Sequence, residues 1–170
     1  MDLATLANLA ELFGAAVVVG GVVFAIVEIR NFQRQRLEAA AMELIRAWQS
    51  PYFTRAFTVI QALPDDRSAT ELRAHGADTE SLAMVIGNTF ESIGVMVYRR
   101  IVPLAIVNEL MGGAAVHLWR KLERWTLETR AEQSRDNVYE WFQWLADRLQ
   151  ELPDFGTGPP AHVARRDWKP

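Results

Sequence analysis

The sequence predicts an all-α protein with a single N-terminal transmembrane helix followed by a cytoplasmic antiparallel helical bundle. Three observations predict this fold class. Residues 12–27 form an uncharged, proline-free apolar run close to the N-terminus. Arginines follow this run, whereas acidic residues precede it. Beyond the arginines, apolar residues recur at helical spacing, and no segment shows a convincing strand-like alternation of apolar and polar residues.

The apolar run approaches the thickness of a membrane. As a helix, residues 12–27 extend about 24 Å, slightly less than the ~30 Å hydrocarbon core, and Leu3, Leu6 and Leu9 prolong the apolar surface. A signal peptide would carry positive charge before the run, and an interfacial helix would need a strongly polar face. A buried helix of a soluble protein is the remaining alternative. We predict a transmembrane span.

The flanking charges predict the orientation of this span. Three arginines follow the apolar run: Arg30, Arg34 and Arg36. The positive-inside rule therefore places the C-terminal side in the cytoplasm and the N-terminus outside. We expect three parts in the chain: a transmembrane anchor over 1–29, a cytoplasmic helical bundle over 30–152, and an irregular, basic, Pro/Gly-rich tail over 153–170.

One face of the anchor carries small side chains. At 100° per residue, Ala10, Gly14, Gly21 and Ala25 fall within a narrow arc, and Glu28 lies on the same arc. Small residues let a second helix approach closely in a bilayer, although glycine is also common in membrane helices in general. We predict that this face packs against a partner helix and that Glu28 contacts a partner.

The first helix is expected to continue without a break to Trp48, because residues 30–48 contain no glycine or proline. Ser50 and Pro51 are an N-cap and a first-turn proline, and they predict a short helix ending near Leu63. Trp48 is expected to pack beneath this start. Residues 65–77 are predicted to be a loop with one helical turn.

Four further segments complete the predicted bundle. Asp78 or Thr79 caps a helix whose apolar residues recur at three- and four-residue spacing. Pro103 opens a short helix that ends at Gly112–Gly113, since paired glycines commonly stop helices, and a long amphipathic helix follows. The last helix places Val138, Phe142, Leu145, Leu149 and Leu152 on one face and is ended by Pro153.

Several short motifs resemble a widespread bacterial family of membrane-anchored helical proteins whose domain has no assigned function. They include Val-Glu-Ile-Arg-Asn at 27–31, Phe-Glu-Ser-Ile-Gly at 90–94 and Tyr-Glu-Trp-Phe-Gln-Trp-Leu at 139–145. The resemblance covers most of the chain up to residue 152. It implies the anchor and the bundle, and hence a single-pass location in the bacterial inner membrane. It brings no catalytic residues.

A search for chemistry returns little. His75, His117 and His162 show no metal-ligand spacing, and no phosphate-binding loop or nucleophile motif is present. Glu91 is expected to be partly buried and paired with Arg99 or Arg100. We predict no catalytic, cofactor or metal site. Clustering of Glu91, Asn88 and His117 in one pocket would instead favour an enzyme.

Tryptophans and the tail offer candidate contacts with other proteins. Trp119 and Trp125 are expected in the core, whereas Trp141 and Trp144 flank an apolar stripe, and one of them can reach the surface. The tail combines cations with an aromatic residue in Arg165, Arg166 and Trp168. These last three, together with Trp141 and Trp144, are the candidate partner contacts; core packing is the favoured role of the two tryptophans, and disorder is the alternative for the tail.

The expected function is binding rather than catalysis. We predict a non-enzymatic accessory subunit of a multi-subunit bacterial membrane complex, with other membrane-protein subunits and the lipid bilayer as partners and with no small-molecule substrate. We suggest an energy-converting photosynthetic or respiratory assembly, although no residue specifies it. The alternative is a membrane-tethered homo-oligomeric sensor or signalling adaptor. A net charge of −3 gives no footprint for nucleic acid, and the absence of cysteine agrees with a reducing compartment.

Overall fold

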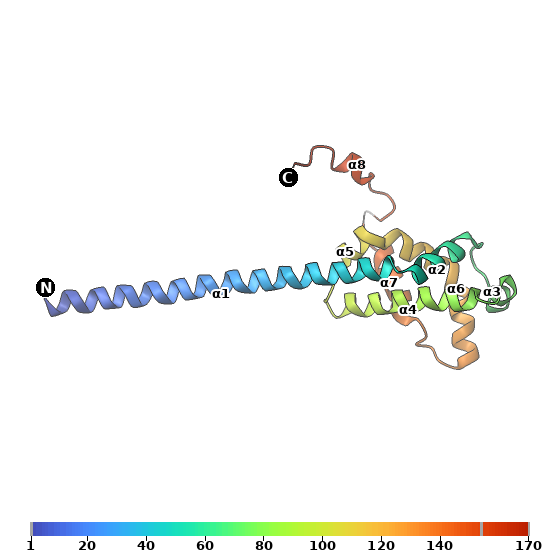
Figure 1. Ribbon diagram of the computed structural model, residues 1–170, viewed down its shortest axis with the longest axis horizontal. Helices are drawn as coiled ribbons and strands as arrows, with labels where there is room; N and C mark the ends of the chain where they lie inside the picture. Colours follow the sequence, from blue (N-terminus) through green and yellow to red (C-terminus); the bar gives the residue numbers. More distant parts are fainter. Residues whose placement is uncertain (1, 154, 170) are drawn as a thin grey trace. The chain divides into compact units, whose positions relative to one another are not determined.

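The computed structural model is all-α (Figure 1), with no strand in the residues that it describes. These are residues 2–153 and 155–169, without the side chains of residues 3–10 and 12. The chain divides into two compact units, Met1–Ala40 and Ala41–Pro170. We call the second the helical unit. The three-part division at residues 29 and 152 stays a prediction.

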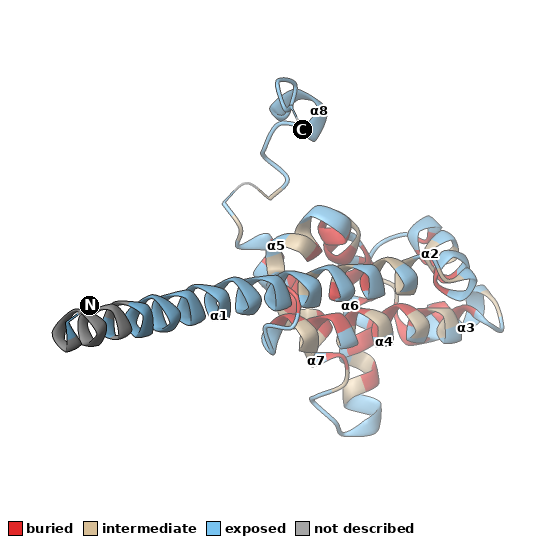
Figure 2. Cartoon of the chain, turned by 60° about the vertical axis from the view of Figure 1, so that its left-hand side comes forward, coloured by how far each residue is buried: buried red, intermediate tan, exposed pale blue. Residues whose placement is uncertain are grey.

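The N-terminal helix α1 extends over Leu3–Trp48. Every side chain from residue 13 to residue 36 is exposed (Figure 2), including the valines and phenylalanines of the apolar run. The helix is long and apolar enough to cross a membrane. The predicted apolar N-terminal helix is therefore confirmed.

Helix α2 extends over Pro51–Ala62 and begins as the sequence predicts. The Ser50 hydroxyl accepts a hydrogen bond from the Phe53 amide at 3.1 Å, and Pro51 occupies the first turn. The ring of Trp48 lies 4.8 Å from that of Phe53, centroid to centroid. The expected packing of Trp48 at this helix start is confirmed.

Helix α3 extends over Ala69–His75 and is longer than the single turn expected in this loop. Its N-terminus carries a capping box: the Ser68 hydroxyl accepts from the Glu71 amide at 3.2 Å, and the Glu71 carboxylate accepts from the Ser68 amide at 2.9 Å. Two backbone donors are satisfied reciprocally, which stabilises a helix that would otherwise be too short to persist.

Helix α4, over Thr79–Tyr98, lies at the centre of the helical unit. It packs against α2 and against α7, which extends over Glu140–Gln150. The buried ring of Phe90 lies 6.0 Å from Phe53 of α2 and 4.8 Å from Phe142 of α7. By length and composition α4 also passes as a membrane span. Its apolar side chains are instead used in the core, so we interpret it as a core helix.

The expected helix stop at Gly112–Gly113 is wrong. Helix α5 (Leu104–Val107) continues through the π-helix η1 (Asn108–Gly112) into α6, which extends over Gly113–Gln133. Both glycines have right-handed helical backbone angles. A side chain at Gly112 would lie 2.5 Å from the Asn108 side-chain oxygen. Gly112 therefore provides space for the side chain at Asn108 rather than a break in the helix.

The last long helix, α7, is shorter than predicted. Val138 and Leu152 lie outside its bounds, and the helix ends at Gln150, before Pro153. At its start, Tyr139 adopts a left-handed backbone conformation with φ 53°. Trp119 and Trp125 are buried as expected. The tail contains only the short helix α8 (Ala161–Ala164) within the described residues 155–169.

Two glycines provide a matched test of this packing. At Gly94 an added Cβ would overlap the backbone carbonyl of Trp141, whereas at exposed Gly113 it would meet nothing within 4 Å. We expect Gly94→Ala to lower the free energy of unfolding by about 1–3 kcal/mol through overpacking. Gly113→Ala is expected to raise it by about 0.5–1 kcal/mol. Denaturant unfolding followed by tryptophan fluorescence measures both, and equal effects at the two positions would contradict the α4–α7 contact.

Candidate interaction surface

The small-residue face of α1 is open in the structure. Gly14, Gly21, Ala25 and Glu28 are all exposed, and a Cβ added at either glycine meets nothing within 4 Å. The side chain of Ala10 lies outside the described residues. No residue of unit Met1–Ala40 covers this face in the described part of the chain, and its packing against another helix stays a prediction.

The C-terminal end of α4 presents exposed side chains on a tight turn. Tyr98 is the last helical residue, Arg99 is the C-cap, and Arg100 has a left-handed φ of 57°. The Arg100 amide donates to the Val97 carbonyl at 2.9 Å and the Ile101 amide to the Met96 carbonyl at 2.9 Å. These bonds close the helix end, and they leave the side chains of residues 98–101 exposed.

The two tryptophans singled out as candidate partner contacts meet at this helix end. Trp141 and Trp144 are half-buried, with ring centroids 6.0 Å apart. Tyr98 joins them, at 4.6 Å from Trp141 and 6.0 Å edge-on from Trp144. Sequence reasoning missed Tyr98 because it follows Val97 and so lies beside the apolar stripe of α4. We use the name arginine–aromatic patch for Tyr98, Arg99, Arg100, Ile101, Trp141 and Trp144.

The arginine–aromatic patch carries net positive charge. In the described part of the chain, neither Arg99 nor Arg100 has a carboxylate within 4.0 Å, although ten other ion pairs are formed. A hollow of about 410 Å³ adjoins the patch, and its charged lining residues are Arg100 and Arg148. Arg148 is paired with Glu151 at 2.5 Å.

The predicted contact residues of the tail are exposed. Arg165 and Arg166 follow α8 directly, and the Trp168 side chain is 71% exposed. The Trp168 amide donates to the Arg165 carbonyl at 3.0 Å, so these residues form a turn. Contact with a partner stays a prediction for all three.

The expected pairing of Glu91 with Arg99 or Arg100 is wrong. The Glu91 carboxylate accepts a hydrogen bond from the backbone amide of Phe142 at 2.9 Å, at the N-terminus of α7. Burial raises the pKa of Glu91, and the amides of Phe142 and Trp141 oppose this shift. Unpaired amides at a helix start attract a carboxylate. Glu91 therefore caps α7 from the neighbouring helix α4.

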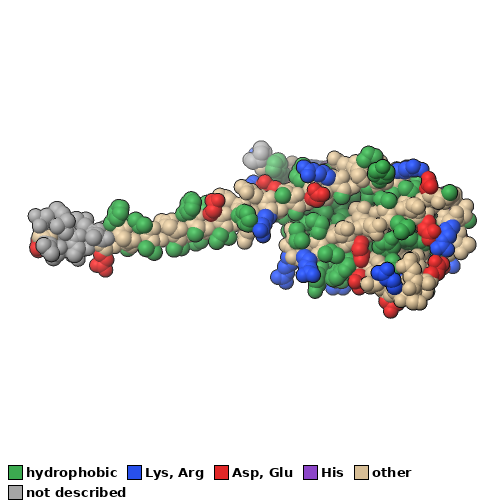
Figure 3. Space-filling view, turned by 60° about the horizontal axis from the view of Figure 1, so that its bottom comes forward, with side chains coloured by type: hydrophobic (Ala, Val, Ile, Leu, Met, Phe, Trp, Pro, Cys, Tyr) green, Lys and Arg blue, Asp and Glu red, His purple; other side chains and the backbone are tan. Residues whose placement is uncertain are grey.

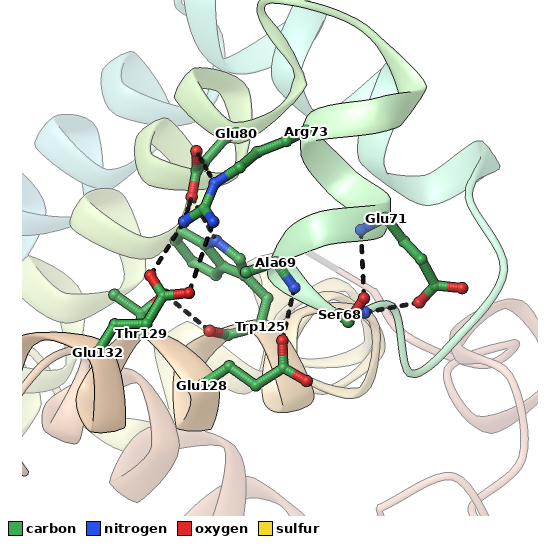
Figure 4. A network of polar contacts seen from close by, with 9 residues as sticks. All are labelled: Ser68, Ala69, Glu71, Arg73, Glu80, Trp125, Glu128, Thr129 and Glu132. Atoms are coloured by element: carbon green, nitrogen blue, oxygen red, sulfur yellow. Dashed lines mark hydrogen bonds and ion pairs between the residues drawn. The ribbon is translucent and has the colours of Figure 1, made fainter.

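A second polar cluster connects α3 to α4 and α6 (Figure 4). Arg73 of α3 bonds Glu80 of α4 at 2.9 Å and Glu132 of α6 at 3.1 Å. The Trp125 indole donates to Glu80 at 3.3 Å, and the Ala69 amide donates to Glu128 at 2.7 Å. Arg73 keeps the pKa of Glu80 below its ordinary value. These carboxylates are engaged in joining helices.

The residues that would have favoured an enzyme do not share one of the described hollows. Asn88 lines a hollow of about 340 Å³ with residues of α1 and α4, and His117 lines another of about 510 Å³ with residues of η1, α6 and the tail. The carboxylate of Glu91, which comes from α4, bonds the start of α7. Within the described residues, no group of three or more His, Cys, Asp or Glu side chains is arranged to hold a metal ion.

These observations define a class: an all-α protein with an apolar N-terminal helix and an aromatic, arginine-bearing surface. Residues 15–149 match the family described as "Domain of unknown function (DUF4760)". The match covers well over half of the chain, and the protein belongs to this family. No curated protein and no solved structure matches the chain.

The cap formed by Glu91 predicts a pH effect. Because the pKa of Glu91 is raised in the folded state, folding favours its protonated form. Its ionisation lowers the free energy of unfolding as pH rises above the ordinary value of 4.5 and through the raised pKa. Glu91→Gln keeps an oxygen acceptor and cannot ionise, so we expect it to match the wild type near pH 4 and to exceed its stability at pH 7.

The alanine variant separates the cap from the charge. Glu91→Ala removes the acceptor for the Phe142 amide, and because neither variant can ionise we expect it to be about 1 kcal/mol less stable than Glu91→Gln at both pH values. Urea titrations of the three proteins at the two pH values measure the effects. A glutamine variant no more stable than the wild type at pH 7 would disprove the burial effect, and one as unstable as the alanine variant would disprove the cap.

Proposed function

We propose that this protein is a non-enzymatic accessory subunit of a multi-subunit complex in the bacterial inner membrane. In this proposal α1 crosses the membrane once, with the N-terminus outside. The helical unit is an antiparallel bundle in the cytoplasm, where it contacts partner subunits.

The observation that carries the proposal is the uncovered apolar stretch of α1. Its side chains are exposed from residue 13 to residue 36, with Phe13 73%, Val18 66% and Phe24 69% accessible. Burying one such side chain is worth about 1.5–3 kcal/mol, and no part of the described chain provides that burial. A bilayer does so while the backbone hydrogen bonds remain internal to the helix.

The charges that flank the stretch support the orientation. The arginines that follow it are exposed. Arg34 pairs with Glu38 at 3.0 Å, and the guanidinium of Arg36 lies 4.4 Å from the ring centroid of Phe32. Positive charge adjoining a span remains on the cytoplasmic side. This favours a cytoplasmic helical unit.

The open small-residue face of α1 supports helix packing in the membrane. Gly14 and Gly21 leave room on the side of the helix that also carries Glu28. Close approach of two helices at small residues is a known packing mode in bilayers. A carboxylate near the membrane edge gains from a cation on a partner. Both features favour association with another membrane protein.

The state of the polar residues favours binding over catalysis. Glu91 caps a helix, and Glu80, Glu128 and Glu132 hold α3 against its neighbours. Catalytic acids and bases need a perturbed pKa within an accessible pocket. The one carboxylate of the described chain whose pKa is raised, Glu91, bonds a backbone amide instead.

The deciding experiment is mild detergent extraction of native membranes, followed by affinity purification of the tagged chain and mass spectrometry. A fixed set of membrane subunits at constant stoichiometry is the expected result, and it would also identify the complex. Recovery of this chain alone would contradict the accessory role and favour the self-associating sensor.

The small-residue face gives a specific prediction. Gly14→Leu and Gly21→Leu are expected to reduce recovery of the partner subunits severalfold, because a bulky side chain separates the packed helices. A Cβ added at either glycine meets nothing within 4 Å, and both positions lie outside the helical unit, so we expect the helical unit to unfold as in the wild type. The control is Val23→Leu, on the opposite face of α1. Equal partner recovery for all three variants would contradict packing at this face.

A further inference from the structure

We propose that the arginine–aromatic patch rests on the anionic lipid headgroups of the membrane that holds α1. This inference depends on the proposed membrane insertion of α1. It adds a second contact with the bilayer, one that would fix the orientation of the helical unit at the membrane surface.

The composition of the patch fits a headgroup layer. Tyrosine and tryptophan rings are enriched at that depth of a bilayer, where one part of the side chain is apolar and the other is polar. Tyr98 and Ile101 are each 55% exposed. Arg99 and Arg100 are exposed on the same turn, and arginines near an anionic surface gain about 1 kcal/mol each.

The backbone at Arg100 supports a role for its charge. This residue has a left-handed φ of 57°, a conformation in which glycine is free of the steric cost that an L side chain meets. Its backbone amide donates a hydrogen bond to the Val97 carbonyl, and glycine would donate the same bond. An arginine here in place of glycine favours a contact of its side chain outside the chain.

The patch also lies at a suitable end of the helical unit. Within this unit, residues 43–47 of α1 and residues 88–96 of α4 line one hollow, so the C-terminal half of α4, which leads into the patch (Figure 1), lies beside the segment by which the chain enters the unit. Hydrophobic and Lys or Arg side chains gather side by side at that end (Figure 3). The helical unit is separated from the apolar run only by residues 28–40. As a helix, this connecting segment is about 20 Å long. This short connection keeps the patch at a high effective concentration near the lipid surface.

The charge of the patch favours lipid over an apolar protein surface. Arg99 and Arg100 have no carboxylate partner among the described residues. The adjoining hollow is lined by Arg100 and Arg148 together with apolar residues such as Val102 and Leu104. A phospholipid offers phosphate and hydrocarbon in that same combination.

The chain contains no cysteine, which permits a direct test with single labels. Full-length Ile101→Cys and Leu127→Cys proteins carry a nitroxide and are reconstituted in vesicles of phosphatidylcholine alone or mixed with phosphatidylglycerol. Leu127 is the matched control, an exposed apolar residue of α6 at 48% accessibility. Collision rates with oxygen and with a water-soluble nickel chelate report the depth of each label.

We expect the label at 101 to be shielded from nickel in anionic vesicles, less so in phosphatidylcholine, and the label at 127 to remain accessible in both. Adding Arg99→Gln and Arg100→Gln to the protein labelled at 101 should reduce the ratio of lipid-docked to undocked helical units by about fivefold per arginine. The control pair Arg120→Gln and Arg135→Gln should leave this ratio unchanged. A label at 101 as accessible as the label at 127 in anionic vesicles would overturn the proposal.

A third label separates failure of the patch from failure of the anchor. Val18→Cys reports whether α1 lies in hydrocarbon, where oxygen collisions are frequent and nickel collisions rare. A buried label at 18 with an exposed label at 101 would reject lipid docking and leave the anchor intact. An exposed label at 18 would reject the anchor itself. Shielding of 101 only in the presence of co-purified subunits would assign the patch to an acidic protein surface and overturn the lipid assignment.

Discussion

Everything else in this protein depends on removing the apolar stretch of α1 from water. The helix holds valine, isoleucine and phenylalanine side chains exposed between residues 13 and 36, and no described part of the chain covers them. An isolated helix gains little from propensity alone, so the stability of this stretch must come from its surroundings. In the proposed function a bilayer satisfies that need, and it holds the helical unit at the membrane without a large adhesive surface of its own.

The helical unit is built as a rigid support. Phe90 of α4 lies between aromatic rings from α2 and α7, and Trp119 contacts Phe142 edge-on at 5.2 Å. Around this core the carboxylates bond helix starts and neighbouring helices, as Glu91 does at α7 and Glu128 at α3. These groups already have partners inside the fold, which agrees with the proposed binding role.

The sequence predicted what local chemistry decides. Ser50 and Pro51 correctly placed the start of α2, and apolar spacing placed α4 in the core. The signal for α3, a serine three residues before a glutamate, was present and was missed. The predicted helix stop at Gly112–Gly113 was wrong, because Gly112 leaves room for the Asn108 side chain and does not end a helix. The partner of Glu91 was beyond prediction, since it is a backbone amide 51 residues away.

The arginine–aromatic patch shows the same limit at the surface. Trp141 and Trp144 were identifiable as flanking residues of their helix, but Tyr98 comes from α4, and only tertiary structure brings its ring to 4.6 Å from Trp141. Core aromatic residues such as Trp125 are explained by burial. Burial does not explain half-exposed rings beside two arginines that have no carboxylate partner among the described residues, and Arg100 occupies a backbone position that glycine would fill with less strain. We therefore interpret their combination as a surface for a contact outside the chain.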